Sequence, residues 1–453
     1  MEKSLQIICF LSFLFFLTSE SFAQQSSWTW MKGDTISGST GIFGTITVAD
    51  SLNTPPALYE PCEWLDHQGK FWLFGGLHGV NEYGALWTYD PLANMWTWMH
   101  GLSSLNPTGS YGTKGVPAAS NRPGSRFCAS SWVDTSGNLW MYGGYGRTTN
   151  NIVGGLSDLW KYDINTNLWT WMSGFNTLDV TAVFGTQGMA DSANTPGGRL
   201  ETAATWVDDS NNLWLFGGIL CCSASGDMND IWKYNMSTSE WTWVKGSSAP
   251  NQLSVYGTKG VPAADNTPGG RRVYSHWKTA DNKFWIFGGQ QYSNDCYADL
   301  WRYDPETNEW TWMSGSSAAN FTGSYGNICK PDSLNEPPAR MENRFYSTDS
   351  CFNFWMFGGT NTVLNEYYND AWYYNTSVNE WKWISGSDST GENGFYGTQG
   401  VPGIDNHPGA RFGGVAWQGP DQTFWLFGGD GLDFGQLNDL WRLQPAECIE
   451  CSP

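Results

Sequence analysis

Five arginines recur at matching places in the sequence, each at the start of an apolar stretch. They are Arg126, Arg199, Arg271, Arg340 and Arg411, and Leu58 stands at the sixth place. A ring of guanidinium groups binds a carboxylate or sulfate through paired hydrogen bonds. These arginines, with Tyr292 and His407 beside them, are therefore the candidate ligand-binding residues.

The same arginines have a structural alternative, in which each one fixes its own neighbouring loop. A partner for that role would be the acid that precedes a loop proline, as Asp191, Asp265 and Asp405 do. Residues that recur in most copies of a repeat usually serve the repeat. We favour the structural role, and we interpret the aspartates as turn residues rather than calcium ligands.

Three histidines, His78, His100 and His407, are the weak candidates for a metal site, because imidazole suits copper and zinc. Their positions lack the spacing of a ligand set. Surface or turn histidines are the favoured interpretation. We therefore predict no metal, no cofactor and no catalytic residue.

The sequence contains ten cysteines, of which nine follow the N-terminal apolar segment, so at least one cannot pair within the mature chain. We predict a disulfide between Cys296 and Cys329, which follow neighbouring strands on one face. A second predicted disulfide joins Cys62 and Cys128 on adjacent inner strands. Spacing alone leaves the pairing of Cys221, Cys222, Cys448 and Cys451 open.

These residues are positioned by an apolar strand with a terminal glycine pair that the chain repeats six times. The copies are 71–76, 139–144, 213–218, 284–289, 354–359 and 424–429. In the copy from Arg126 to Met172, three further short runs accompany this strand, which predicts a four-stranded antiparallel sheet. A fixed long period of this kind is typical of a repeat architecture.

The two ends of the repeat complement each other. After Trp441 the last copy has no fourth strand, whereas Trp28-Thr-Trp30 is a fourth strand without a sheet of its own. The sequence therefore predicts an all-β, six-bladed propeller over residues 24–445, in which the N-terminal strand closes the last blade. The recurrent outer tryptophans, such as Trp310 and Trp312, are expected to pack the blades rather than to stack on sugars.

Two kinds of connection emerge on one face of the predicted propeller. A 26-residue insert links each fourth strand to the next first strand, and an aromatic residue followed by glycine stands at the same offset in all six inserts. This constancy predicts a compact loop anchored by its own ring. The connections between second and third strands vary in length, so we place the ligand on this long-loop face, over the axis.

The ends and the charge of the chain restrict its setting. Residues 1–23 have the pattern of a secretory signal peptide, which predicts a secreted, periplasmic or cell-surface protein, and residues 446–453 form a cysteine-containing tail or the start of a linker. No later stretch has the length of a membrane span. A net charge of −20 argues against nucleic acid as a partner.

The glycine pair after an apolar strand, followed by tryptophans nine residues apart such as Trp232 and Trp241, resembles the kelch repeat. The resemblance extends over the mature chain apart from the tail and implies a relationship to the central propeller of galactose oxidase and to bacterial sialic-acid mutarotases. The adjacent Tyr-His pair of the oxidase has no match here. We predict a non-catalytic scaffold for a protein or glycan ligand, with a carbohydrate-active enzyme of one of these two types as the alternative. Ligand identity, metal binding, disulfide pairing, oligomeric state and a continuation beyond Pro453 stay open.

Overall fold

The computed structural model describes residues 26–201, 203–221, 226–330, 332–432, 435–446 and 449. The predicted signal peptide, Cys222, Cys448 and Cys451 lie outside these residues. The described part of the chain consists of strands and connections and contains no helix that could cross a membrane.

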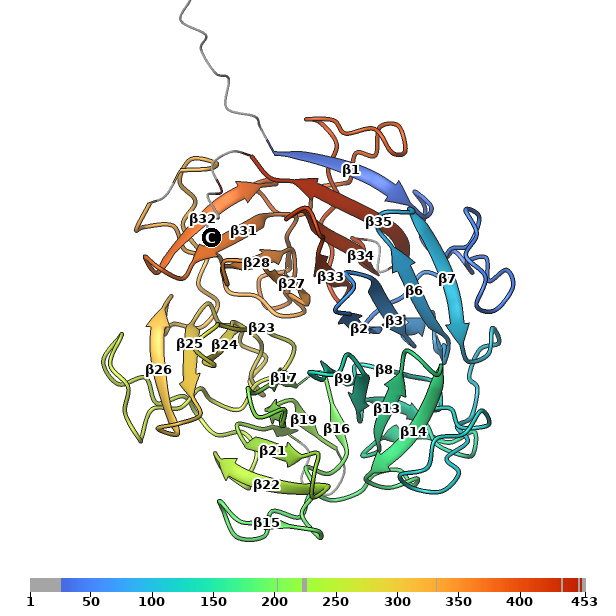
Figure 1. The fold of residues 1–453 in the computed structure, drawn as a ribbon. Coiled ribbons are helices and arrows are strands. Elements are labelled where there is room, and N and C mark those ends of the chain that lie inside the picture. Colours follow the sequence, from blue (N-terminus) through green and yellow to red (C-terminus); the bar gives the residue numbers. More distant parts are fainter. Residues whose placement is uncertain are drawn as a thin grey trace, which may run out of the picture.

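Six antiparallel sheets, five of four strands and one of five, surround a central axis (Figure 1). The innermost strands are β2 (Cys62–Leu65), β9 (Ser130–Val133), β17 (Ala204–Val207), β23 (Ser275–Lys278), β27 (Phe345–Thr348) and β33 (Val415–Gln418). The second strands are β3 (Phe71–Phe74), β10 (Leu139–Tyr142), β18 (Leu213–Phe216), β24 (Phe284–Phe287), β28 (Phe354–Phe357) and β34 (Phe424–Asp430). We number the blades 1 to 6 in this order.

The outer half of each blade has the predicted third and fourth strands. The third strands are β6 (Leu86–Asp90), β13 (Leu159–Asp163), β21 (Ile231–Asn235), β25 (Leu300–Asp304), β31 (Ala371–Asn375) and β35 (Gln436–Gln444). The fourth strands are β7 (Met95–His100), β14 (Leu168–Ser173), β22 (Glu240–Lys245), β26 (Glu309–Ser314), β32 (Glu380–Ser385) and β1 (Ser27–Lys32).

The N-terminal strand closes the ring, as the sequence predicted. Strand β1 pairs antiparallel with β35, with Trp28 opposite Leu443 and Trp30 opposite Trp441. In Figure 1 the blue β1 lies beside the red β35. Closure leaves no terminal blade with an unpaired inner face.

Large aromatic side chains hold the blades together. Each hydrophobic cluster combines residues of two neighbouring blades, as when Phe71 stacks on Trp417 with ring centroids 4.9 Å apart. Trp310 of blade 4 likewise packs against Phe216 of blade 3, with ring centroids 5.2 Å apart and the rings tilted by 60°. The predicted packing role of the recurrent tryptophans is confirmed, because burial between sheets is the main stabilising term for such rings.

The inserts follow the outer edges of the blades and do not cover the axis. In each insert one asparagine donates its side-chain amide to a carbonyl of the fourth strand, as Asn53 does to Trp96 at 3.1 Å. The predicted ring anchor is confirmed, since Phe43 packs between Trp87 and Trp98. In blade 3 the insert adds a short strand, β15 (Ala190–Asp191), to the outer edge. The inserts therefore protect edge strands that would otherwise be open to pairing.

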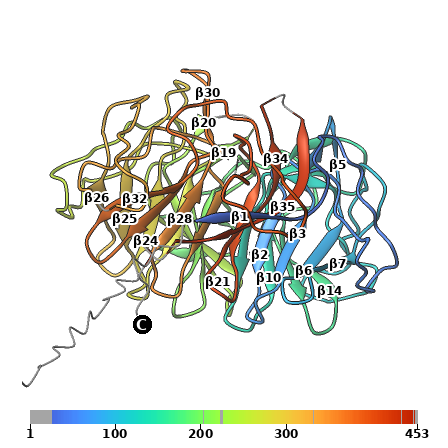
Figure 2. The same ribbon diagram turned by 90° about the horizontal axis from the view of Figure 1, so that it is seen from above.

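Short hairpins between second and third strands project from the long-loop face (Figure 2). They are β4 (Leu77–His78) with β5 (Asn81–Glu82), β11 (Tyr145–Arg147) with β12 (Val153–Gly155), β19 (Ile219–Leu220) with β20 (Gly226–Asp227), and β29 (Thr360–Asn361) with β30 (Glu366–Tyr367). Strands β8 (Arg126–Phe127) and β16 (Arg199–Leu200) join β11 and β19. The predicted ligand face is thus built from these hairpins.

Candidate functional site

Six residues at matching positions form a ring around the axis, two residues after the arginine or leucine that opens each first strand. They are Glu60, Cys128, Glu201, Val273, Glu342 and Gly413, and all have φ between 48° and 63°. The backbone N–H of Cys128 donates to Glu60 O at 3.0 Å, and that of Glu60 donates to Gly413 O at 2.7 Å. Hydrogen bonds between neighbouring blades therefore hold a left-handed backbone that is rare for residues other than glycine.

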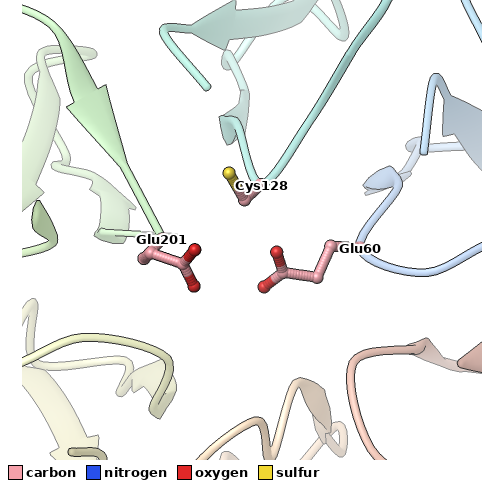
Figure 3. Close-up of side chains that lie close together, drawn as sticks. All are labelled: Glu60, Cys128 and Glu201. Carbon is pink, nitrogen blue, oxygen red and sulfur yellow. The ribbon is translucent and has the colours of Figure 1, made fainter. Parts of the chain in front are cut away.

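This backbone brings chemically active side chains together on the axis. A carboxylate oxygen of Glu60, the Cys128 Sγ and a carboxylate oxygen of Glu201 lie within 4.8 Å of one another (Figure 3). Glu60 and Cys128 are buried, whereas Glu201 is half-buried. We call Glu60, Cys128, Glu201 and Glu342 the axial cluster.

Glu342 interacts with Glu201 through its charge and with the side chain of Glu60, although it lies outside the three donors that are within 4.8 Å of one another. Its Oε1 accepts a hydrogen bond of 2.9 Å from the Tyr59 hydroxyl. A side chain at Gly413 would collide with the Tyr59 ring, because an added Cβ would lie 2.1 Å from it. The glycine in blade 6 therefore allows Tyr59 of blade 1 to reach Glu342 of blade 5.

Arg344 lies next to the axial cluster and carries a buried positive charge. Its Nη2 donates to Glu63 Oε2 at 2.9 Å and to Pro61 O at 3.1 Å. Its Nη1 lies 3.6 Å from Glu60 Oε1. The Arg344 guanidinium thus lies close to both Glu63 and Glu60, and acidic groups outnumber this positive charge on the axis.

Burial, and for some groups a neighbouring acid, raises the pKa values on the axis. Burial, followed by the charge of Glu60, raises the pKa of Glu201 to about 8, and burial with the charge of Glu201 raises the pKa of Glu342 to about 8. Burial raises the pKa of Glu63 to about 7, although Arg344 opposes this change. Burial also raises the pKa of the Cys128 thiol well above its ordinary value. Without a cation in addition to the neighbouring arginines, the cluster favours protonated groups.

A cavity of about 490 Å³ occupies the axis on the other side of Arg344 and Glu63. Its walls are the second to fourth residues of all six innermost strands. These strands run from the inserts toward the short turns, so the cavity lies toward the short-turn face. His276 Nε2 lies 3.1 Å from Thr205 Oγ1 and 3.0 Å from the Tyr346 hydroxyl, and burial lowers the pKa of His276 to about 3.

The five predicted arginines are structural and do not line a ligand rim. Each is at most 2% exposed and pairs with the aspartate that precedes its own third strand: Arg126 with Asp158, Arg199 with Asp230, Arg271 with Asp299, Arg340 with Asp370, and Arg411 with Asp439. The arginine also donates to the carbonyl of the first glycine of the pair, as Arg340 does to Gly358 at 2.8 Å. The structural interpretation thus holds, but the expected partners were wrong. Asp191 instead accepts from the backbone N–H of Ala193 within its turn.

Each ion pair connects the first strand of its blade to the third strand and, in four blades, to the insert. We call this group of contacts a joint. Besides the arginine, the aspartate accepts from the tryptophan two residues later and, in four blades, from the insert tyrosine, as Asp370 does from Trp372 and Tyr325. In blade 1 all three polar positions are apolar at once, as Leu58, Ala85 and Phe43. Blade 3 keeps the ion pair but has Phe184 in place of the tyrosine.

The remaining predicted site residues are scattered. Tyr292 is 65% exposed on the loop of blade 4, where it lines a small pocket with Gln252 and Leu253. His407 lies in the last insert, where it lines a separate pocket with Trp28 and Trp383. The structure therefore does not bring Tyr292 and His407 together with the arginines as one site.

The three candidate histidines also do not form a ligand set in the described part of the chain. His78 Nδ1 contacts Ala57 O at 2.9 Å, and the His100 ring packs edge-on against Tyr162. Burial lowers the pKa of His100. Among the described residues, the close group of potential metal ligands contains Glu60, Cys128 and Glu201, and no histidine.

Both predicted disulfides are wrong. Cys62, Cys128 and Cys296 are free and buried, whereas Cys329 is disulfide-bonded. Cys221 and Cys351 are disulfide-bonded as well. The prediction failed because neighbouring positions on a propeller do not ensure that two Cβ atoms face each other.

The comparisons with known proteins agree with this architecture. A family model described as the KLHDC2/KLHL20/DRC7 Kelch-repeats domain matches residues 111–319 and 183–385. The chain belongs to the kelch-repeat family. Together the two matches extend over more than half of the sequence.

Individual relatives of this kelch protein are distant. Mei4-dependent protein 6 of Schizosaccharomyces pombe is 23% identical over 389 residues, which are 82% of this chain and 45% of the relative. Tip elongation aberrant protein 1 of the same yeast is 25% identical over 252 residues, which are 53% of this chain and 17% of the relative. The chain spans less than half the length of each of these relatives.

A solved structure, that of YjhT, shares the fold. Its TM-score is 0.50 with 14% sequence identity, and the match covers 85% of this chain and 95% of that one. At this identity the likeness concerns the fold alone. It transfers no residue of a site.

Proposed function

We propose that this kelch propeller is a secreted, non-catalytic binding module that engages a protein partner through its long-loop face. The observation that carries the proposal is the composition of the hairpin tips. Val80, Ile152 and Val363 lie at three hairpin tips and Tyr292 on the corresponding loop of blade 4, and they are 89%, 64%, 51% and 65% exposed. Each of these connections thus presents an exposed apolar or aromatic side chain that can contact another protein.

The rest of the scaffold suits this role. The hairpins differ in length from blade to blade on a rigid frame, which is where recognition loops are usually found. The net charge of −20 favours a partner with a basic surface around its apolar contacts. The inserts lie along the outer edges and leave the hairpin tips exposed.

Secretion is part of the same proposal. The N-terminal pattern of residues 1–23 predicts cleavage before Gln24. Disulfide bonding of Cys221, Cys329 and Cys351 supports an oxidising compartment, because disulfides persist outside the cytosol. Expression of the full chain in a secreting host, followed by N-terminal sequencing, should give a mature start near Gln24. Retention of an intact N-terminus within the cytosol would contradict this part.

The binding face is tested with two matched variants of the mature chain. The first replaces Val80, Ile152 and Tyr292 by serine. The second replaces Leu92 and Val378 by serine. These two residues are 87% and 57% exposed and lie on the short-turn face. Both variants remove exposed apolar side chains without touching a blade core, so circular dichroism should show native folding for both.

Binding is measured by crosslinking to cell-envelope proteins and, in parallel, on a glycan array. We expect the hairpin variant to lose a crosslinked partner that the short-turn variant retains, because loss of one apolar anchor weakens binding by about 10-fold. If binding to a particular glycan is lost in the hairpin variant, the ligand of this face is a glycan and not a protein. Equal binding by both variants would show that the long-loop face is not the contact.

A further inference from the structure

We propose that Glu60, Cys128, Glu201 and Glu342 bind one zinc ion on the axis of the propeller. This site is separate from the hairpin tips and from the joints. It depends on residues that differ between blades, although they occupy the same ring position.

The donors converge from different blades. Glu60, Cys128 and Glu201 come from blades 1, 2 and 3, and their donor atoms already lie within 4.8 Å of one another. A tetrahedral zinc ion, with bonds of about 2.0 Å to oxygen and 2.3 Å to sulfur, separates its donors by about 3.3 to 3.7 Å. These three donors would have to approach one another by about 1 Å, and Glu342, which lies outside the group, would have to move toward the ion as the fourth donor.

Glu342 supplies a second, independent indication of a ligand. It is 2% exposed, and its Oε2 has no hydrogen-bond partner among the described residues. Its Oε1 is oriented by the Tyr59 hydroxyl. A buried carboxylate oxygen without a partner is costly. A metal ion on the axis would satisfy it, while Tyr59 would act as the outer residue that orients a ligand carboxylate.

The mixture of donors selects the metal. Calcium takes six to eight oxygen ligands, and magnesium keeps several waters, so neither uses a thiol. Zinc accepts thiolate and carboxylate together. On binding, the Cys128 thiol and any protonated carboxyl group release their protons to solvent, and the ion replaces those protons with two positive charges. No oxidation or reduction is involved.

Arg344 is the resident cation that the ion would join. Its Nη2 is committed to Glu63, and its Nη1 lies at 3.6 Å from Glu60, beyond hydrogen-bonding distance. Arg344 and Arg272, whose own ion pair is with Asp227, oppose the raised pKa of Glu201, but burial still keeps that pKa high. The half-buried Glu201 marks the side from which an ion would enter.

Metal content tests the site directly. The mature protein, purified under reducing conditions, is dialysed against zinc chloride and then against metal-free buffer, and bound zinc is measured by mass spectrometry. We expect one zinc per chain. Replacement by cobalt should add a thiolate-to-cobalt charge-transfer absorption that identifies sulfur as a ligand.

Four variants separate the site from adventitious binding. Cys128→Ser should abolish the cobalt charge-transfer band, and Glu201→Gln should abolish stoichiometric zinc without removing a buried thiol. Tyr59→Phe should weaken zinc about 10-fold, as loss of an outer hydrogen bond to a ligand does. The matched control is Cys296→Ser, which removes another buried free thiol and should keep one zinc per chain.

The outcomes show whether the axial cluster binds a zinc ion or is only protonated. Zinc that is absent from the native protein, or that survives both Cys128→Ser and Glu201→Gln, would overturn the proposal. If Cys128→Ser fails to fold, Glu201→Gln with the unchanged thiol still decides the question. Zinc should also raise the melting temperature of the native chain and of Cys296→Ser, but not that of Glu201→Gln.

Discussion

The joints and the axial cluster both bury ionisable groups, yet only the joints balance their charges. In blade 5 the Arg340 guanidinium donates two hydrogen bonds of 2.7 Å to the Asp370 carboxylate. Tyr325 and Trp372 donate further hydrogen bonds to the same carboxylate. On the axis, several acids share Arg344. The balanced pair recurs in five blades, whereas the axial acids outnumber the guanidinium beside them.

This difference separates structural residues from candidate functional ones. A paired and fully hydrogen-bonded charge has no remaining capacity for a ligand. A group that lacks its counter-charge in the fold retains that capacity, at a cost in stability. The repeat therefore explains the arginines, and only the departures from the repeat point to binding.

The largest expected effect comes from breaking one joint. Arg340→Met should destabilise the protein by about 3 to 5 kcal/mol, because it leaves the Asp370 carboxylate buried without its partner. The free energy of unfolding, measured in urea, checks this value. The triple variant Arg340→Leu, Asp370→Ala and Tyr325→Phe copies the apolar set that blade 1 already has as Leu58, Ala85 and Phe43.

The triple variant is the control that shows what the ion pair contributes. It should recover most of the stability lost in Arg340→Met, since replacing a buried pair by well-packed apolar groups is often close to neutral. A triple variant as unstable as the single one would mean that the joint stabilises blade 5 by its net attraction. Blade 1 would then depend on some other compensation.

A smaller effect, with a defined pH range, is expected at His276 in the axial cavity. Burial and the positive charge of Arg344 lower the pKa of His276 to about 3, so the folded protein holds it neutral beside Thr205, Tyr346 and Glu63. The unfolded chain takes up a proton below about pH 6.5. Stability is therefore lost as the pH falls from about 6.5 toward 3, at about 1.4 kcal/mol per pH unit for this group.

The measurement compares unfolding free energies of the native chain and His276→Gln between pH 4 and 7. The variant should lose stability less steeply on acidification, because it has no imidazole to protonate on unfolding. His67→Gln, at an exposed position on a short turn, is the matched control and should follow the native chain. Parallel curves for all three proteins would show that His276 is not held neutral.

Much of this fold could be predicted from the sequence, because the evidence for it is repeated. The glycine pairs, the nine-residue tryptophan step and the constant insert gave the six blades, the closure by Trp28 and Trp30, and the anchoring ring of the insert. The path of the insert along the outer edge was not predicted. The hydrogen bond between the insert asparagine and the fourth strand, such as that of Asn53 with the carbonyl of Trp96, cannot be predicted without knowing which strand lies at the open edge of the sheet.

The partners of the arginines were present in the sequence but hidden by the assignment of strands. Asp158 directly precedes the apolar run of the third strand, so the sequence pattern presents it as part of that strand and not as a partner of Arg126. The signal for these partners was that Leu58 and Ala85 are both uncharged in blade 1. An unpaired buried charge is costly, so the arginine and aspartate positions must change together.

The axial cluster was missed for the opposite reason. Glu60, Cys128, Glu201 and Glu342 share a register, two residues after the arginine position, but they do not share a residue type. A search for repeated residues passes over them. Comparison of unlike residues at equal register would have found three acids at one position of the ring.

The smallest expected effect concerns the tyrosine that completes a joint. Tyr325→Phe removes the hydrogen bond of 2.7 Å to Asp370 Oδ2, which still accepts from Arg340 and Trp372. We expect a loss of about 1 kcal/mol in the free energy of unfolding. The reverse change, Phe184→Tyr in blade 3, should give a gain of similar size, because Asp230 there lacks a tyrosine partner among its described contacts. If neither change alters stability, the insert is held by its ring alone, and the hydroxyl is incidental to the joint.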